Sequence, residues 1–198
     1  MREKDDYYAT YPANLPALLR VLGFDDGRSR LIREPSCGEG HLSVPLELYG
    51  HQVVSTDLVD RGYGVAGIDF LQHTPQFDNV MYDAVIMNPP FKHAIEFLRK
   101  SLTQAPIVAA FLKMSFLESE TRETFYEDTP ARYVAYFSRR AKSAMNANWK
   151  IAKGETFYAW HIWHFGFKGR PELISIKPEE NDHVRKALAL LQKDDVTQ

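Results

Sequence analysis

The sequence predicts an α/β protein, in which a mostly parallel sheet carries helices on both faces and one antiparallel strand lies near the C-terminus. From residue 31 to about residue 126, short strand-like runs alternate with segments of helical spacing. From residue 133 to residue 176, strand-like runs follow one another with no helical segment between them. Alternation is typical of parallel strands joined by crossover helices, whereas successive strands favour antiparallel pairing. We therefore expect a three-layer sandwich with an antiparallel edge.

Three strands are expected in the first half of the chain. Leu31–Pro35 is a short, largely apolar run that a proline ends, and Gln52–Asp57 is β-branched and closes on an acid. Tyr82–Met87 is largely apolar and runs into two prolines, which cannot donate to a sheet ladder. A further run, Ile68–Leu71, is short enough to be either a strand or a turn.

Helices are expected between these strands. Residues 41–49 fit a helix that Gly50 ends, because glycine readily adopts the left-handed conformation that follows a last helical turn. Residues 93–102 have apolar side chains at helical spacing, and residues 118–126 form a third candidate helix.

The second half is expected to hold four strands and a closing helix, at Ile107–Met114, Tyr133–Phe137, Phe157–Phe167, Leu173–Ile176 and Asp182–Gln192. The helix lies within a C-terminal helix and tail, residues 178–198. His161 and His164 fall in one of these strands, where their odd separation puts them on opposite faces. We expect ordinary sheet histidines and no metal site.

Length and composition predict one soluble, folded domain over residues 1–198. The chain is 44% hydrophobic and 25% charged, which disfavours disorder. A single cysteine excludes an intrachain disulfide and a cysteine-built metal site. No run approaches the ~20 apolar residues of a membrane helix, and the start resembles no secretory signal, so we expect a cytoplasmic protein without membrane contact.

Basic residues gather in one acid-free stretch, residues 132–154, although the net charge of the chain is −2. Such a stretch is as readily a solvated face as a binding surface. Trp149 lies inside it, and an aromatic ring flanked by cations can stack on a nucleic-acid base or anchor a loop. We treat residues 138–156 as a candidate substrate-facing loop, with Arg139, Arg140, Lys142, Trp149 and Lys150 as candidate substrate-binding residues.

A tight turn, Ser36–Gly40, follows the first predicted strand and precedes a predicted helix. This arrangement points backbone N–H groups at a ligand, and Gly38 and Gly40 let the chain approach closely. The turn lacks the third glycine of a dinucleotide-binding fingerprint, and no Lys-Ser/Thr pair follows it as in a phosphate-binding loop. The sequence therefore favours neither NAD nor ATP.

Two acids follow at the ends of later segments. Asp57 closes the second strand, where a carboxylate can accept from both hydroxyls of a ribose or simply cap a turn. Asp69 can accept from an adenine amino group while Phe70 covers the ring.

The four residues Asn88-Pro89-Pro90-Phe91 end the third strand. The prolines stop the ladder and leave rigid carbonyl groups, with an amide before them and an aromatic ring after them. This set of acceptors and a stacking face suits a flat group that carries an exocyclic –NH2.

In order and spacing, these motifs resemble those of class I S-adenosylmethionine-dependent methyltransferases with a Rossmann-like fold, and more narrowly the N6-adenine branch. The resemblance covers roughly residues 7–117. It implies that Asn88, Pro89, Pro90 and Phe91 are catalytic, with Phe91 also stacking on the substrate base. It implies that S-adenosylmethionine is bound by Thr10, Tyr11, Glu34, Pro35, Ser36, Cys37, Gly38, Gly40, Asp57, Asp69, Phe70 and Asn88.

Within that family, Glu34 and the glycine turn would hold the methionine part of the cofactor, Asp57 the ribose, and Asp69 with Phe70 the adenine. The segment 7–12 lies where one subgroup carries a strap over the cofactor, although Tyr11 interrupts its usual Thr-Pro.

The expected reaction is methyl transfer to adenine N6 of DNA or RNA, and two alternatives stay open. The same four-residue motif serves enzymes that methylate a glutamine amide of a protein or a guanine amine of ribosomal RNA. A catalytically silent subunit could also share the fold, although an intact Asn88 and Asp57 speak against it. Because no target-recognition domain is evident, a partner could supply specificity.

Overall fold

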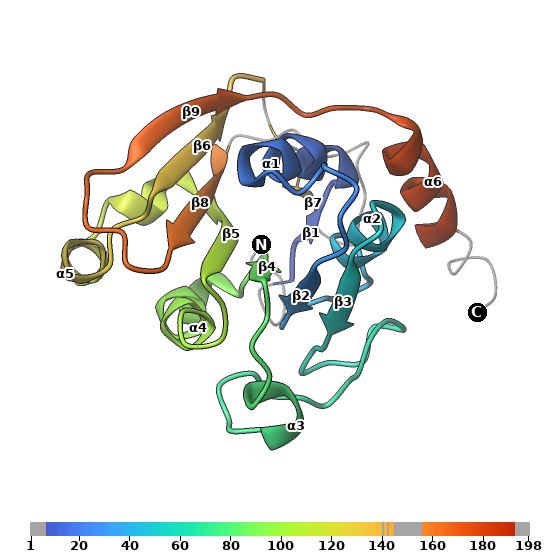
Figure 1. Ribbon diagram of the computed structural model, residues 1–198, viewed down its shortest axis with the longest axis horizontal. Coiled ribbons are helices and arrows are strands. Elements are labelled where there is room, and N and C mark those ends of the chain that lie inside the picture. Colours follow the sequence, from blue (N-terminus) through green and yellow to red (C-terminus); the bar gives the residue numbers. More distant parts are fainter. Residues whose placement is uncertain (1–6, 140, 142, 145–155, 193–198) are drawn as a thin grey trace.

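The predicted mostly parallel sheet is confirmed in the computed structural model, which describes residues 7–139, 141, 143–144 and 156–192 (Figure 1). Strand β8 runs antiparallel to β5 and β6, whereas every other neighbouring pair in the sheet is parallel. The seven strands lie in the order β3 (Gln52–Ser55), β2 (Leu31–Glu34), β4 (Ala84–Met87), β5 (Ile107–Lys113), β8 (Tyr158–His164), β6 (Tyr133–Phe137) and β9 (Glu172–Ile176).

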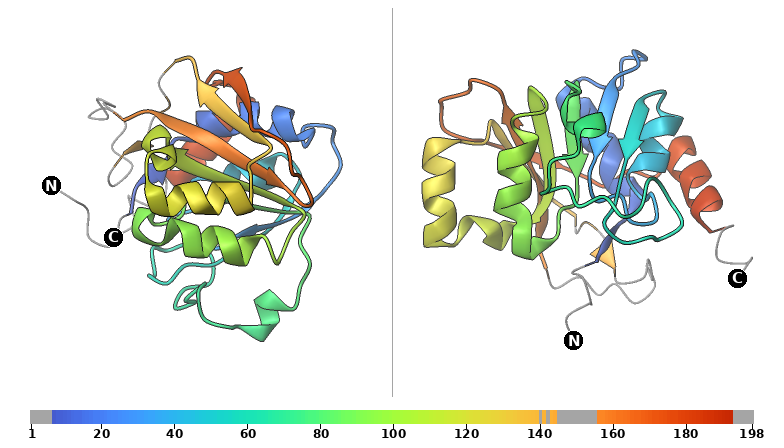
Figure 2. Two further views of the ribbon diagram at one scale, coloured as in Figure 1. Left: turned by 90° about the vertical axis from the view of Figure 1, so that its left-hand side faces the viewer. Right: turned by 90° about the horizontal axis from the view of Figure 1, so that it is seen from below.

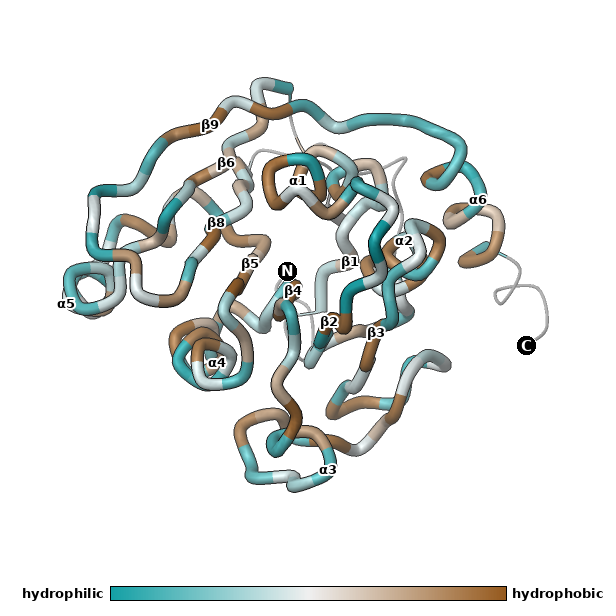
Figure 3. The backbone as a smooth tube through the Cα atoms, in the orientation of Figure 1, coloured by the Kyte–Doolittle hydropathy of each residue, from teal (hydrophilic) through white to brown (hydrophobic). Residues whose placement is uncertain are grey.

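Helices cover both faces of this sheet, as the three-layer prediction requires (Figures 1 and 2). On one face lie α1 (Leu15–Leu22) and α2 (Ser43–Leu48), with α6 (Asp182–Leu191) packed against α2. On the other lie α4 (Ala94–Ser101) and α5 (Glu120–Asp128), beside the short α3 (Pro75–Asp78). Side chains of β4 and β5 alternate between the two cores, so these strands are apolar along their length (Figure 3).

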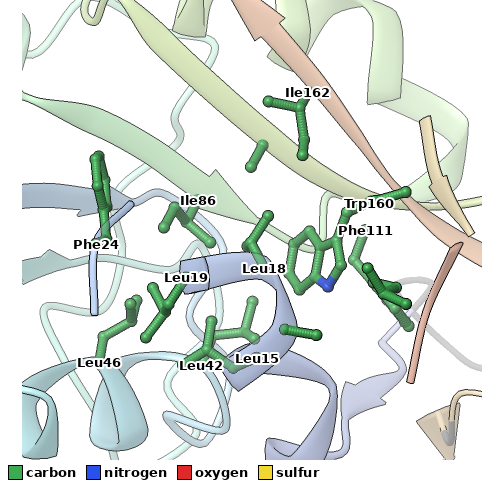
Figure 4. Packing of buried hydrophobic residues seen from close by; sticks show 14 of the residues in the cluster. Leu15, Leu18, Leu19, Phe24, Leu42, Leu46, Ile86, Phe111, Trp160 and Ile162 are labelled. Atoms are coloured by element: carbon green, nitrogen blue, oxygen red, sulfur yellow. The ribbon is translucent and has the colours of Figure 1, made fainter. Parts of the chain in front are cut away.

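Helix α1 is absent from the elements expected from the sequence, yet it supplies the centre of one core. Leu15, Leu18 and Leu19 are fully buried against the sheet and α2 (Figure 4). The indole N–H of Trp160 on β8 donates to the Asn14 carbonyl at 3.0 Å, which fixes the start of the helix to the sheet.

Several predicted boundaries differ from the structure. The run at 68–71 is a turn, and the strand predicted to reach residue 167 ends at His164. The helices predicted at 41–49 and 118–126 begin two residues later, because short turns precede them. Two 2-residue strands, β1 (Ala9–Thr10) and β7 (Ser143–Ala144), pair antiparallel and had no sequence signal. Single-turn 3-10 helices lie at Pro12–Asn14, Phe91–His93 and Met114–Leu117.

The strand order places a crevice beside β2. The chain leaves β2, forms β3 on one side of it, and then crosses to form β4 on the other side. In open parallel sheets, ligands bind outside the carboxyl ends of the strands at such a reversal. Within the described residues, no helix is long and apolar enough to span a bilayer.

We expect Leu18→Ala to lower the free energy of unfolding by about 3 kcal/mol, because truncating a buried leucine loses apolar contact and leaves a cavity. Urea denaturation measures the change. Leu173→Ala is the matched control, since Leu173 is 69% exposed and its truncation should cost less than about 0.5 kcal/mol. Equal costs for the two variants would contradict the central position of α1.

Candidate active site

A cavity of about 630 Å³ opens at the carboxyl ends of β2, β3 and β4, where the strand order reverses. Ten of the sequence-predicted cofactor and catalytic residues line it: Thr10, Glu34, Pro35, Ser36, Cys37, Asp57, Asp69, Phe70, Asn88 and Pro90. Tyr11, Gly38, Gly40, Pro89 and Phe91 are not among its lining residues. The fold therefore brings these ten residues, which are spread between positions 10 and 90 of the sequence, together around one cavity.

The backbone of the glycine turn is hydrogen-bonded to the Asp57 carboxylate. The Gly38 N–H donates to Asp57 Oδ2 at 2.8 Å, and the Val59 N–H donates to Oδ1 at 2.9 Å. Each carboxylate oxygen keeps a second lone pair for a ligand donor. Asp57 thus both fixes the turn and faces the cavity.

Aromatic rings fill the space that the two glycines leave. A Cβ on Gly38 would lie 2.4 Å from the Tyr7 ring, and a Cβ on Gly40 would lie 2.8 Å from the Tyr63 ring. Both glycines also have positive φ, +54° and +84°. The Arg61 guanidinium carbon lies 4.1 Å from the centroid of the Tyr7 ring, so Tyr7 packs between Arg61 and the glycine turn. Residues 7–10 line the cavity beside this turn, and a role for residues 7–12 as a strap over a cofactor stays a prediction.

Glu34 is a buried carboxyl group that lines the cavity and accepts a hydrogen bond from one hydroxyl group. Ser43 Oγ donates to Glu34 Oε2 and lies 2.6 Å from Ser55 Oγ. Burial raises the pKa of Glu34 well above its ordinary range, and the nearby Asp57 charge adds to the rise. A carboxyl in this condition is suited to a cationic ligand group, which would restore the charged form.

The neighbouring Cys37 thiol is buried, and this burial raises its pKa. A thiol in that environment is a poor nucleophile.

Asp69 and Phe70 lie in the turn at residues 68–71, the run that the sequence left open as a strand or a turn. Asp69 Oδ1 accepts from the Leu71 N–H at 3.0 Å, which leaves its other oxygen for a ligand. Phe70 lines the cavity but is only 2% exposed, because it packs on Phe97 at 4.9 Å between centroids. Its ring therefore forms part of the cavity wall.

The Asn88 amide is oriented by the N-terminal segment. Its Nδ2 donates to the Tyr8 carbonyl at 2.6 Å and to Thr10 Oγ1 at 2.9 Å, which uses both of its hydrogens. Ser36 Oγ donates to the Asn88 carbonyl at 3.1 Å. The Asn88 side-chain oxygen consequently remains as an acceptor at the end of β4. Thr10, which the resemblance assigned to the cofactor, acts in this structure on Asn88.

Phe91 belongs to a group of rings beside the cavity. Its centroid is 5.5 Å from Tyr8 and 6.3 Å from Tyr158, and Lys113 Nζ lies 4.4 Å from its ring. Sequence reasoning placed Tyr8 in the segment 7–12 but did not assign it to the acceptor, and it missed Tyr158 and Lys113 at this site. Lys113 could have been identified from the sequence, because it is the charged residue near the end of the apolar strand that follows the Asn88 strand, and these two strands are neighbours in the sheet.

Other predicted residues lie apart from the cavity. Tyr11 donates through its hydroxyl to Glu180 at 2.7 Å, and Arg139 is exposed at the end of β6. Arg140, Lys142, Trp149 and Lys150 lie outside the described residues, so their role stays a prediction.

The two histidines of β8 contact different elements of the fold, His161 contacting α5 and His164 contacting β6. His161 Nδ1 is 2.5 Å from the Tyr126 hydroxyl, and burial lowers the His161 pKa to about 3. His164 packs edge-on against Tyr133. No group of metal-ligating side chains is found among residues 7–139, 141, 143–144 and 156–192.

Substitution of Gly38 tests the packing of Tyr7 on the turn. Gly38→Ala should destabilise the protein by more than Gly27→Ala, whose added Cβ meets no atom within 4 Å. Both positions have positive φ, so each substitution carries a conformational cost of about 1 kcal/mol, and the difference reports the Tyr7 contact. Thermal or urea unfolding measures both. In a Tyr7→Ala background the two costs should become equal; a persistent gap would show that Tyr7 does not occupy this space.

Comparison with known proteins gives structural neighbours but no sequence relatives. No protein-family model and no curated protein matches the sequence. A protein from Listeria monocytogenes, assigned as a class I S-adenosylmethionine-dependent methyltransferase, superposes with a TM-score of 0.60 and 12% identity. The match covers 91% of this chain and 69% of that one.

Two further solved structures share the fold. A protein from Pyrococcus horikoshii, assigned as an RNA methyltransferase, has a TM-score of 0.52 and 17% identity over 77% of this chain and 82% of its own. A modification subunit assigned to a type I restriction enzyme of Vibrio vulnificus has a TM-score of 0.56 and 11% identity over 94% of this chain. The chain spans 53% of that subunit. The protein therefore has the Rossmann-like fold of class I methyltransferases.

Proposed function

We propose that this protein transfers a methyl group from S-adenosylmethionine to adenine N6 of a nucleic acid. The observation that carries the proposal is the oriented Asn88 amide at the end of β4, beside a cavity with two acidic residues on adjoining strand ends. An amide oxygen and a proline carbonyl in sequence suit the two hydrogens of an exocyclic amine.

The cavity fits the proposed cofactor in size and in chemistry. Its volume, about 630 Å³, lies in the range of small-molecule sites. The buried Glu34 carboxyl has a neutral partner, the Ser43 hydroxyl, and would pair with the ammonium of the methionine part. Asp57 would accept from the ribose hydroxyls, and Asp69 with the edge of Phe70 would border the adenine.

The protein's contribution to the reaction would be positioning and electrostatics. When bound, the cofactor supplies an electrophilic methyl group on a sulfonium. The Asn88 oxygen and the Pro89 carbonyl would accept the two N–H bonds of the acceptor amine and localise its nitrogen lone pair toward that methyl group. Transfer would form the new N–C bond as the C–S bond breaks, and the acidic cationic product would release its proton to solvent. A dedicated general base is unnecessary.

Nucleic acid is the acceptor that the surroundings of Phe91 favour. Phe91 lies beside Tyr8, Tyr158 and Lys113, and aromatic rings with a cation suit an unstacked base and its backbone. Two of the structural neighbours are assigned to RNA methylation and to a restriction–modification enzyme. A glutamine amide would also fit the Asn-Pro-Pro motif but would not require the rings.

Incubation with radiolabelled S-adenosylmethionine and separate pools of DNA, RNA and protein tests the acceptor class. We expect label in a nucleic-acid pool, and chromatography of its hydrolysate should identify N6-methyladenine. Label in the protein pool alone would contradict the nucleic-acid proposal. Absence of cofactor binding by calorimetry would contradict the proposed activity as a whole.

Asn88→Ala should abolish methyl transfer while changing cofactor affinity by no more than a few fold, because its side chain is proposed to hold the acceptor. Asn79→Ala is the matched control and should keep full activity, because Asn79 is an exposed asparagine at the end of α3 and does not line the cavity. Asp57→Ala should instead weaken cofactor binding by about 1–3 kcal/mol, the cost of a lost charge-assisted hydrogen bond. Steady turnover by Asn88→Ala would remove this residue from the mechanism.

Cofactor affinity should rise with pH through the pKa of Glu34. In the free protein that pKa is raised, so the carboxyl is protonated at pH values where an ordinary glutamate is charged. Pairing with an ammonium requires the carboxylate, so binding at lower pH releases a proton and is weaker. Calorimetry in buffers of different ionisation enthalpy measures this proton. Glu34→Gln should flatten the pH dependence; an unchanged profile would show that Glu34 does not face the ligand's ammonium.

A further inference from the structure

A lysine lies on the substrate side of the site, over the ring that the proposed function assigns to the acceptor base. Lys113 is the last residue of β5, and its partner across the antiparallel ladder is Tyr158 on β8. Its Nζ is 4.4 Å from the centroid of Phe91 and 6.0 Å from that of Tyr8. We call Tyr8, Phe91, Lys113 and Tyr158 the lysine–aromatic cluster.

Within the described part of the chain, the charge of Lys113 has no counter-charge. Among the residues that the structure describes, no carboxylate lies within 4.0 Å of its ammonium group, and no hydrogen bond from it is found. Two other cations of the fold are, in contrast, paired with carboxylates: Lys100 Nζ is 2.8 Å from Asp78 Oδ2, and Arg132 is 2.9 Å from Glu172. Lys113 therefore keeps its ammonium donors for a group outside the protein.

Contact with the rings alone does not account for this placement. A partly exposed cation over an aromatic ring contributes only about 0.5–1 kcal/mol, and Lys113 is half-buried at the carboxyl edge of the sheet. At this edge its charge lies next to the reaction site. The chain continues from Pro90, which lines the cavity, directly into Phe91, so an acceptor ring stacked there would lie beside the ammonium.

We infer that Lys113 binds a backbone phosphate of the nucleic acid next to the target nucleotide. The inference rests on the proposed function, because a phosphate one sugar away from the base is the anion that every polynucleotide brings to this position. A lysine acts there as a point charge and adds affinity without reading sequence. Lys113 is thus a substrate-binding residue, and its partner is the phosphodiester group.

The test measures binding of a labelled oligonucleotide by fluorescence anisotropy, in saturating S-adenosylhomocysteine, over a series of salt concentrations. Lys113→Gln should weaken binding several-fold and reduce the slope of log affinity against log salt by about one, as expected for one lost phosphate contact. Lys113→Arg should keep both values. Lys186→Gln, on the exposed face of α6 away from the site, is the control and should leave the slope unchanged.

A neutral methylphosphonate linkage placed at each position around the methylated adenine then locates the contact. One position should weaken binding to the wild type by the same factor as Lys113→Gln and should have no further effect on that variant. An unchanged salt slope in Lys113→Gln, or additive losses at every linkage, would overturn the assignment of Lys113.

Failure of the inference is distinguishable from failure of the proposed function. A wild-type protein that methylates a nucleic acid, combined with a silent Lys113→Gln, overturns the phosphate contact alone. A wild-type protein that labels only the protein pool overturns both.

Discussion

The site depends on one polar contact between distant parts of the chain, the amide of Asn88 held by residues 8–10. Both Nδ2 hydrogens are used by the Tyr8 carbonyl and by Thr10 Oγ1, across about eighty residues of sequence. An asparagine amide can otherwise rotate and present either its donor or its acceptor. This contact selects the acceptor, and the proposed chemistry requires an acceptor at that position.

The same short segment links several other features of the site. Ala9 and Thr10 form β1, which pairs with β7, and Tyr7 packs on Gly38 with Arg61 on its outer face. The N-terminal segment thus contacts the glycine turn, Asn88 and the strand at 143–144. The orientation of Asn88 consequently depends on the position of this segment.

Two ionisable side chains at the end of β2 are buried. Glu34 is buried as a carboxyl, and Arg33, the residue before it, is 1% exposed with Phe77, Tyr82 and Phe70 around its guanidinium. Its Nε and Nη1 have no hydrogen-bond partner among the described residues. Groups of this kind are costly to bury. Glu34 lines the cavity, whereas Arg33 does not and instead packs among aromatic rings.

Much of the fold could be predicted because it depends on local periodicity and on strand-ending residues. Strands β2, β3, β4 and β5 were placed within about two residues, since prolines, glycines and acids mark their ends. Helix α1 was missed although its leucines are regularly spaced. The turn at 68–71 was undecided, because its length fits a strand and only the pairing geometry excludes one.

The sequence predicted many of the residues that line the cavity but not the contacts between their side chains. The motifs identified residues that the strand order brings to one edge of the sheet, such as Glu34, Asp57 and Asn88. Periodicity says nothing about which side chains meet across the sheet. Hence the position of Thr10 on Asn88, of Tyr7 on Gly38 and of Lys113 on Phe91 emerged only from the structure.

The most direct test of the central claim is a crystal structure with a non-reactive cofactor analogue in which an amine replaces the methyl-bearing sulfonium. We predict that the nucleoside of the analogue lies between Asp57 and Phe70. The amine that takes the place of the transferable methyl group should lie on the Asn88 side. Its separation from the amide oxygen should leave room for roughly one acceptor amino group, as a near-attack arrangement requires. An analogue whose transferable position lies more than about 10 Å from Asn88, in an otherwise native fold, would contradict it.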